Sequence, residues 1–403
     1  MSAPYPIAVR SRWVTARPRN NYARHSAESV PRCGKGTGAG PFAAARKRPT
    51  ISKGECTMED TTVLEVRNLR TYFYTNGTEL RAVDGLSYTL HKGECMAIIG
   101  ESGSGKTVSA LSLLRLVPYP PGLIMGGEII LNGQNLMELS DEEIKHIRGK
   151  DISMIFQEPS AALNPVITIG RQIAESIMLH KGLNKEQALH EAAGLLAKVG
   201  IPNPEQRIKE YPHQFSGGMQ QRAMIAMAMS CQPDVLVADE PTTALDVTVQ
   251  AQVLEQLNQL RKDFGTALII ITHNLGVVAE ICDKVSVMYA GRMVEQGPVD
   301  DIFYRPAHPY TVGLLRSMPR VDAEEHERLI PIEGTPVDML NPPEGCPFAP
   351  RCPHAMKICL QKMPPYVEVG EGHRSACWLR VQEQINNQKA GGKPAAQEGN
   401  EHE

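Results

Sequence analysis

At 403 residues the chain is long enough for two or three structural units, and a net charge of −3 with 42% hydrophobic residues describes an ordinary soluble protein. This balance argues against a general nucleic-acid binder. No apolar run approaches the ~18–20 residues that a membrane span requires, so any work at a membrane would depend on a partner.

The first segment, residues 1–57, is basic, with 11 Lys and Arg residues against the acidic Glu28 and Glu55. It is rich in Arg, Pro, Ala, Ser and Gly and has no sustained period, so we predict that residues 1–60 are disordered. Met58 directly precedes the first strand-like pattern, which favours Met58 as the true start of the protein. A functional basic tail and a targeting segment are the alternatives.

A glycine-rich turn between a strand and a helix is the central motif of the chain. The apolar run Cys95–Ile99 predicts a buried strand, and the helical spacing from Val108 to Leu116 predicts a helix. In a P-loop of this kind, backbone N–H groups point into one concavity beside the positive end of a helix. The residues of the turn are Gly100, Glu101, Ser102, Gly103, Ser104, Gly105, Lys106 and Thr107.

This turn predicts a nucleotide site. We expect Lys106 to reach the β- and γ-phosphates and the Thr107 hydroxyl to ligate Mg²⁺. Short alternating segments from Val63 to Leu90 predict antiparallel strands joined by a turn at residues 75–77. Tyr72, Phe73 and Tyr74 precede that turn, and one of these rings could stack on adenine; a cross-strand aromatic pair is the structural alternative.

Polar residues at the ends of three later strands fit the same site. Gln157 follows the strand 152–156 and can offer an amide oxygen to Mg²⁺ while it senses the γ-phosphate. Asp239 and Glu240 end the next strand, where Asp239 can hold Mg²⁺ through water and Glu240 can polarise the attacking water. His273 follows the strand 267–272 and is placed to contact the γ-phosphate.

A helical block interrupts the α/β pattern at residues 166–230 and ends in a second glycine-rich helix start. Ser216 can cap that helix, and Gly217 and Gly218 leave its positive end bare, which predicts a second anion site; an ordinary glycine-rich helix start is the alternative. The other expected elements are a loop at 118–127, strands at 128–131, 285–289 and 291–297, and helices at 173–180, 185–199, 219–230 and 247–262.

Together these motifs resemble the ATPase subunit of an ABC transporter over about residues 62–300. The matching motifs are Walker A (Gly100–Thr107), the Q-loop (Gln157), the signature (Ser216, Gly217, Gly218, Met219, Gln220), Walker B (Val235–Glu240), the D-loop (Ala244–Asp246) and the H-loop (His273). The joint occurrence of ordered motifs is highly specific. Four segments resemble the dipeptide/oligopeptide/nickel importer branch, most of all its D-type ATPase. These segments are Gln157–Pro159, Ala162–Pro165, Tyr211–Arg222 and Pro306–Thr311. Phe215 and Met219 depart from the common signature in a way usual for this branch.

The resemblance implies a P-loop NTPase of the α/β class. It would have a RecA-like core with an antiparallel β subdomain, within residues 61–300, and a helical signature subdomain at about 160–232. A small Cys/Pro-rich C-terminal extension at 301–383 would follow, and residues 384–403 read as disordered. Phe73 is most similar to the family's adenine-stacking aromatic, Val108 joins the ATP contacts, and Asp246 is the D-loop residue.

The C-terminal extension contains Cys346, Cys352, Cys359 and Cys377 among several prolines, which suggests a thiolate metal site. The spacing is neither that of most zinc fingers nor a ferredoxin run. The resemblance implies a [4Fe–4S] cluster with a structural role; zinc and free or disulfide-forming cysteines are the alternatives. His354 and His373 are expected at the surface, with ligation as the alternative.

The resemblance further implies how the protein works. ATP would lie between the Walker A motif of one ATPase subunit and the signature of a second, a heterodimer with a paralogous F-type ATPase being expected. Two transmembrane permease subunits and an extracytoplasmic solute-binding protein would complete a di- or oligopeptide importer at the cytoplasmic face of the inner membrane. Nickel or another small solute is the alternative cargo, and a soluble ABC ATPase acting on ribosomes or DNA is the alternative class.

Overall fold

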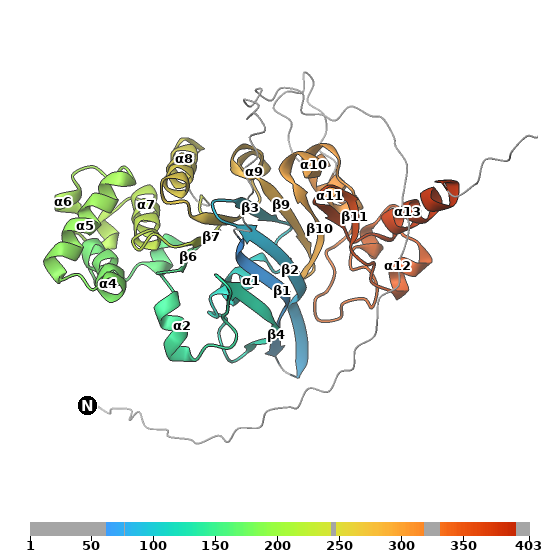
Figure 1. Ribbon diagram of the computed structural model, residues 1–403, viewed down its shortest axis with the longest axis horizontal. Helices are drawn as coiled ribbons and strands as arrows, with labels where there is room; N and C mark the ends of the chain where they lie inside the picture. Colours follow the sequence, from blue (N-terminus) through green and yellow to red (C-terminus); the bar gives the residue numbers. More distant parts are fainter. Residues whose placement is uncertain (1–61, 76, 243–246, 318–330, 392–403) are drawn as a thin grey trace, which may run out of the picture.

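The computed structural model describes residues 62–75, 77–242, 247–317 and 331–391. The expectations for residues 1–60, for the D-loop residue Asp246 and for residues 392–403 lie outside this part of the chain. Two sheets form the centre of the described structure, with helices beside them (Figure 1).

The strands are β1 (Thr62–Thr75), β2 (Thr78–His91), β3 (Cys95–Ile99), β4 (Gly122–Leu131), β5 (Gln134–Asn135), β6 (Ile152–Ile155), β7 (Val235–Asp239), β8 (Ala267–Ile271), β9 (Lys284–Tyr289), β10 (Arg292–Pro298), β11 (Val367–Gly370) and β12 (His373–Ser375). The helices are α1 (Lys106–Leu113), α2 (Asp141–Ile147), α3 (Pro159–Ala162), α4 (Ile169–Lys181), α5 (Lys185–Lys198), α6 (Pro204–Arg207), α7 (Gly217–Ala228), α8 (Val247–Phe264), α9 (Leu275–Ile281), α10 (Val299–Tyr304), α11 (Pro309–Arg316), α12 (Lys357–Gln361) and α13 (Trp378–Gly391), with 3-10 turns η1 (Pro212–Gln214) and η2 (Ala349–Arg351).

The larger sheet carries the strands of the predicted site. Its order is β11-β12-β10-β9-β3-β8-β7-β6, and β3, β6, β7, β8 and β9 run parallel to their neighbours within this set. The five residues of β3, of β7 and of β8 are all buried, as expected for strands covered on both faces. The carboxyl ends of parallel strands meet at one edge, so the P-loop, Gln157, Glu240 and His273 follow strands that end together.

The smaller sheet is the antiparallel β subdomain, with the order β2-β1-β4-β5. The strand β4 begins at Gly122, so the expectation of a loop through 127 is wrong. Backbone pairing explains the difference, because Phe73 of β1 lies opposite Gly122 and Tyr72 lies opposite Leu123. Tertiary pairing thus overrides the local turn signal of the glycines and prolines.

The helical subdomain is confirmed, and Figure 1 places α4, α5, α6 and α7 together at one end of the molecule, beyond β6. The three predicted helices in this block occur with their ends shifted by a few residues. In the core, α1 spans Lys106–Leu113 rather than 108–116. The helix begins directly after Gly105, which has the left-handed backbone conformation. It ends shortly before Arg115, which has φ of 51°.

The C-terminal extension adds two strands to the larger sheet. Its strand β12 pairs with β10, so that Glu295 lies opposite Ser375, and β11 follows as the edge of the larger sheet. The predicted disorder from residue 384 is wrong up to residue 391, because α13 continues to Gly391. Its residue Gln384 donates a hydrogen bond to the carbonyl of Glu368 in β11 at 2.6 Å, which ties the helix to the sheet.

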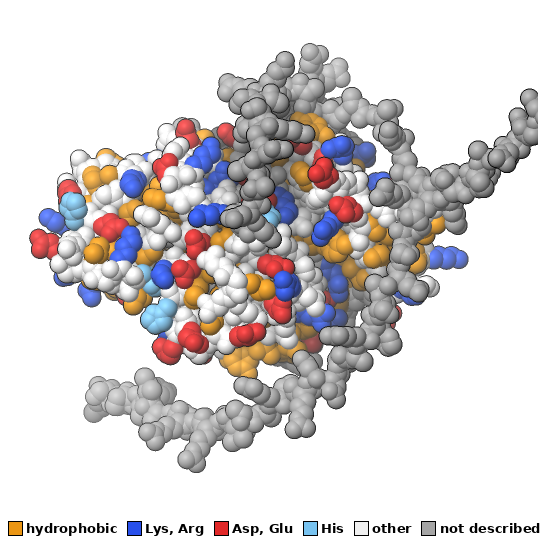
Figure 2. All heavy atoms as spheres, viewed as in Figure 1, with side chains coloured by type: hydrophobic (Ala, Val, Ile, Leu, Met, Phe, Trp, Pro, Cys, Tyr) orange, Lys and Arg blue, Asp and Glu red, His pale blue; other side chains and the backbone are white. Residues whose placement is uncertain are grey.

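None of the helices in the described ranges is both long and apolar enough to cross a membrane. On the face drawn in Figure 2, acidic and basic side chains of the described residues are interspersed rather than gathered by sign.

Candidate nucleotide site

The P-loop connects the end of β3 to the start of α1 and passes close to neighbouring backbone. A Cβ atom on Gly105 would lie 2.1 Å from the carbonyl oxygen of Ala82, and one on Gly100 would lie 2.2 Å from that of Met288. Gly105 also has φ of 96°, in the left-handed region that favours glycine. Only glycine fits these two positions. Close packing against neighbouring backbone, as well as the turn of the chain, therefore requires the glycines of the motif.

Lys106 lies inside the loop that it follows. Its Nζ donates to the carbonyl oxygens of Gly100 and Glu101, both at 2.9 Å. Burial lowers the pKa of Lys106, and the carboxylates of Glu240, Asp239 and Glu101 oppose that effect. The Lys106 amine therefore lies at the centre of the loop, and its exchange of these carbonyl partners for phosphate oxygens stays a prediction.

Asp239 and Thr107, the residues predicted to hold Mg²⁺, lie side by side. Asp239 ends β7 and is 2% exposed, and burial raises its pKa while a hydrogen bond with the Thr107 side chain opposes the rise. Its Oδ1 atom and the Oγ atom of Ser104 are buried and have no hydrogen-bond partner among the described residues. Buried polar atoms without partners are costly, so these oxygens fit a site that a bound ion and phosphate complete.

Gln157, Glu240 and His273 come together although they follow three different strands. The Gln157 amide donates to Glu240 Oε2 at 2.7 Å, and His273 Nδ1 lies 3.4 Å from Glu240 Oε1. Glu240 has φ of 45°, a rare conformation for a non-glycine residue, and its N–H donates to the carbonyl of Ile271 at 2.9 Å. Such strain at the end of a strand is typical of functional residues.

Phe73 is half-buried near the end of β1, against Gly122. Its neighbour Tyr72 is buried and donates from its hydroxyl to Asp84 at 2.9 Å, so Tyr72 has a structural role. Tyr74 is 43% exposed. The stacking of Phe73 on adenine stays a prediction, as does the contact of Val108, in the first turn of α1, with nucleotide.

The signature residues begin α7. The Ser216 side chain accepts from the Met219 N–H at 3.3 Å and caps the helix, and Gln220 donates to the carbonyl of Pro212 at 2.9 Å. A Cβ on Gly217 would meet nothing within 4 Å, whereas one on Gly218 would lie 3.1 Å from a methyl carbon of Val249, so the start of this helix is open at Gly217. Figure 1 places α7 beyond β6, away from α1, so these residues do not join the P-loop of the same chain.

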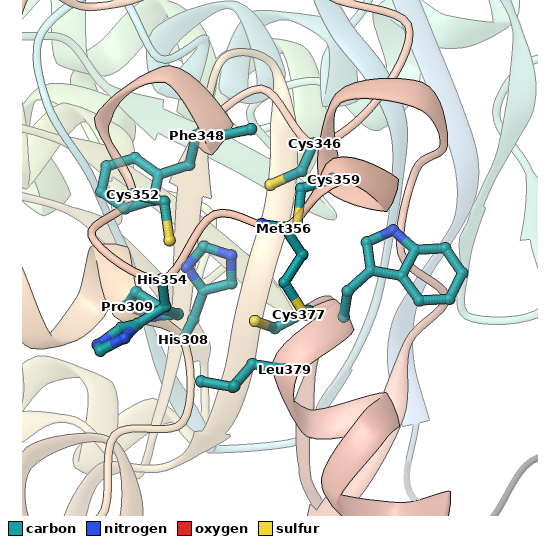
Figure 3. A pocket seen from close by; sticks show the side chains of 12 residues that line it. His308, Pro309, Cys346, Phe348, Cys352, His354, Met356, Cys359, Cys377 and Leu379 are labelled. Carbon is teal, nitrogen blue, oxygen red and sulfur yellow. Dashed lines mark hydrogen bonds between the residues drawn. The ribbon is translucent and has the colours of Figure 1, made fainter.

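The four cysteines of the extension line one pocket, together with His308, His354 and Met356. In Figure 3 their sulfur atoms point toward a shared space from separate segments of chain. Burial raises the pKa of Cys346 to about 12 and raises the pKa of Cys352 and Cys377. All four are free of disulfides, and within the described part of the chain no group of three or more His, Cys, Asp or Glu side chains is arranged to hold a metal ion.

The two histidines of the extension differ. His354 is exposed and borders the cysteine pocket, as expected. His373 is 3% exposed, so its expected surface position is wrong. Its ring forms a hydrogen bond of 2.7 Å with Glu295, whose side chain is fully buried. The burial of His373 is tolerated because this hydrogen bond gives its ring a polar partner in the interior.

The extension also contacts the P-loop, which the motifs did not indicate. The Glu101 N–H donates to the Tyr310 hydroxyl at 2.8 Å, and the Arg351 guanidinium forms an ion pair with the Glu101 carboxylate at 2.7 Å. These residues are 209 and 250 positions away from Glu101, so no local pattern could have found them.

Comparison with known proteins identifies the family of this chain. The model of the ABC transporter family matches residues 83–243, and that of the oligopeptide/dipeptide transporter C-terminal region matches residues 294–359. The chain is 51% identical over 320 residues to the dipeptide transport ATP-binding protein DppD of Bacillus subtilis, covering 79% of this chain and 95% of that protein. It is 50% identical over 321 residues to the oligopeptide transport ATP-binding protein OppD of Salmonella typhimurium, covering 80% of this chain and 95% of that protein.

A solved structure of similar fold is a dimeric ATP-binding cassette in a post-hydrolysis state, bound to ADP and Pi. It superposes with a TM-score of 0.53 at 24% identity and covers 59% of this chain and 98% of that one. At this identity the likeness supports the fold alone.

Proposed function

Because this chain belongs to the ATP-binding subunits of ABC transporters that carry the oligopeptide/dipeptide C-terminal region, we propose that it hydrolyses ATP to power the uptake of di- or oligopeptides. The observation that carries the proposal is the meeting of Gln157, Glu240 and His273 beside a P-loop. Relatives named for dipeptide and oligopeptide transport support the peptide cargo.

The chemistry follows from the positions of these side chains. Lys106 and the loop N–H groups bind the β- and γ-phosphates and offset their charge. Thr107, Asp239 and Gln157 would hold Mg²⁺, which when bound neutralises charge on the phosphates. Glu240 takes a proton from water as the water oxygen attacks the γ-phosphorus, the bond to the ADP oxygen breaks, and ADP and phosphate leave. His273 is placed to contact the γ-phosphate.

A second ATPase subunit completes each site in this proposal. The Walker A and signature residues of one chain lie on different parts of the molecule, so Ser216–Gln220 would contact ATP held by a partner. We infer that the partner is a paralogous F-type ATPase, and that the pair binds two permease subunits and receives peptide from a solute-binding protein. The protein would then work at the cytoplasmic face of the inner membrane, without nucleic acid. Asp246 would act as its D-loop residue.

The decisive experiment is peptide uptake by the transporter reconstituted with its permease subunits. Labelled dipeptide and tripeptide uptake should require ATP and should stop in the Glu240→Gln variant. Uptake of nickel instead of peptide would show that nickel is the transported solute, and the assignment of ATP hydrolysis would stand. Failure to co-purify with any membrane subunit would favour a soluble ABC ATPase and overturn the transport function.

We also propose that Cys346, Cys352, Cys359 and Cys377 hold a [4Fe–4S] cluster with a structural role. The support is chemical: four thiols from separate segments face one pocket, and thiolates are the usual ligands of iron–sulfur clusters. Among the described residues no group of three or more His, Cys, Asp or Glu side chains is arranged to hold a metal ion, and zinc is the alternative occupant of these four thiols. A bound cluster would fasten these segments to one another.

The test is anaerobic purification of the full chain, followed by iron and acid-labile sulfide analysis and a visible spectrum. About four irons and four sulfides per chain with a broad thiolate-to-iron band would support the cluster. Zinc without sulfide, or four free or disulfide-linked thiols, would overturn it. Cys231→Ser, outside the pocket, is the matched control for Cys359→Ser, which should lose iron.

A further inference from the structure

We infer that Arg351, in the C-terminal extension, is a positioning residue for the phosphate-binding loop. It acts through Glu101, the second residue of that loop, and neither side chain is assigned a contact with the reacting atoms. The inference rests on the proposed ATPase function, and it adds the extension as a determinant of nucleotide affinity.

Every N–H of the Arg351 guanidinium has an acceptor. Nη1 donates to Glu101 Oε2 at 2.7 Å and to the Tyr289 hydroxyl at 3.3 Å, and Nη2 donates to Glu101 Oε1 at 3.1 Å and to the Ile332 carbonyl at 3.2 Å. Nε donates to the Glu333 carbonyl at 3.0 Å. The side chain is 5% exposed, so its orientation is strongly determined.

The Arg351–Glu101 pair is bidentate and lies at the inner side of the extension. The guanidinium also lies over the rings of Tyr289 and Phe348, with its central carbon 5.9 and 6.0 Å from their centres. Phe348 and Cys352 flank η2, and both line the cysteine pocket. Folding of the extension therefore determines where the guanidinium meets the P-loop.

Glu101 is held by three groups at once. Its carboxylate accepts from Arg351, its N–H donates to the Tyr310 hydroxyl at 2.8 Å, and its carbonyl accepts from Lys106 Nζ at 2.9 Å. Tyr310 is completely buried. Two of these three contacts thus come from the segment C-terminal to the ATPase core, and only the third comes from the loop itself.

Binding of nucleotide would change one of the three contacts. When Lys106 Nζ turns to phosphate oxygens, the Glu101 carbonyl loses that donor, while the contacts with Arg351 and Tyr310 persist. They would keep the loop in its binding conformation, so less ordering is required when ATP binds. Removal of Arg351 should accordingly weaken nucleotide affinity more than it changes the chemical step.

The experiment measures the dissociation constant of MgATP for the full purified chain by calorimetry. Arg351→Gln and Glu101→Gln should each weaken binding by about five- to twentyfold, which is within the usual range for coupled sites. The double variant should bind no more weakly than the weaker single variant, because both changes break one interaction. Arg351→Lys should retain part of the affinity, since lysine keeps the charge without the fork. Arg374→Gln, exposed on β12, should bind as wild type does.

Thermal unfolding without nucleotide shows whether each variant is folded. It therefore separates a loss of affinity through positioning of the loop from a loss through instability of the protein. Wild-type affinity in folded Arg351→Gln, or strictly additive losses in the double variant, would overturn the proposal. If Arg351→Gln does not fold, Glu101→Gln and Tyr310→Phe provide the same test from the other side. Lys106→Ala distinguishes the two proposals: undiminished ATP binding in that variant overturns the nucleotide site, whereas its loss together with unaffected Arg351→Gln overturns only the role of Arg351.

Discussion

The side chain of Gln157 donates a hydrogen bond to Glu240 at 2.7 Å, across 83 positions of sequence. The residue proposed to sense Mg²⁺ and the γ-phosphate is therefore in direct contact with the proposed general base. In the proposed mechanism, a movement of the segment after β6 would change the hydrogen bond to Glu240 directly, so this contact would link the helical subdomain, which follows Gln157, to hydrolysis.

Replacement of Glu240 by Gln should lower ATP turnover of the assembled transporter by about a hundredfold or more, because a positioned general base contributes ~10²–10⁴-fold. ATP should still bind, so ATP-bound pairs of ATPase subunits should accumulate and be visible by light scattering. Glu280→Gln, exposed on α9, is the control. Turnover equal to wild type would remove Glu240 from the role of base.

Replacement of Gln157 by Ala removes the amide that orients the Glu240 carboxylate. We expect turnover to fall about tenfold while the ATP dissociation constant changes by less than about threefold, since the lost contact acts mainly on the chemical step. Steady-state kinetics with MgATP measures both. Gln259→Ala, exposed on α8, is the matched control. A large loss of affinity with unchanged turnover would contradict the assignment.

The signature helix offers a comparison between two helix caps. Ser216→Ala and Ser140→Ala each remove a side chain that accepts from a backbone N–H at 3.3 Å, so each should destabilise the protein by about 1 kcal/mol in denaturant unfolding. Only Ser216→Ala should lower turnover of the assembled pair, and ATP binding by the single chain should not change. Equal turnover in both variants would argue against a signature role for Ser216.

Glu295 fastens the extension to the core sheet. Its buried carboxylate accepts from the N–H groups of Ala307 at 2.6 Å and His308 at 2.9 Å and from His373 at 2.7 Å. Glu295→Leu leaves these donors without partners, so it should lower the free energy of unfolding by about 3 kcal/mol and expose the extension to trypsin. Glu371→Leu, on the exposed β11–β12 turn, should do neither. A stable Glu295→Leu variant would show that other contacts hold the extension.

The local elements of the core were predictable because their signals are local. Runs such as residues 235–238 and Ala267–Ile271 are continuous and apolar, which identifies buried strands, and glycine at 100 and 105 marks a turn that no other residue fits. The predictions that failed were those in which distant pairing outweighed local composition. The strand β4 begins within a stretch rich in proline and glycine because β1 pairs with it, and α13 continues through polar residues beside β11.

The sequence by itself determined the ATPase core, its motifs and the family resemblance, because short patterns of burial and backbone conformation carry them. Only the tertiary structure decided which side chains meet: Gln157 with Glu240, the four cysteines around one pocket, and Arg351 with Glu101. Contacts between residues more than 80 or 200 positions apart depend on strand order and packing, which no local pattern records. The phosphate-binding loop is recognised from eight consecutive residues. The residues that hold its Glu101, namely Tyr310 and Arg351, lie more than 200 positions further along the chain.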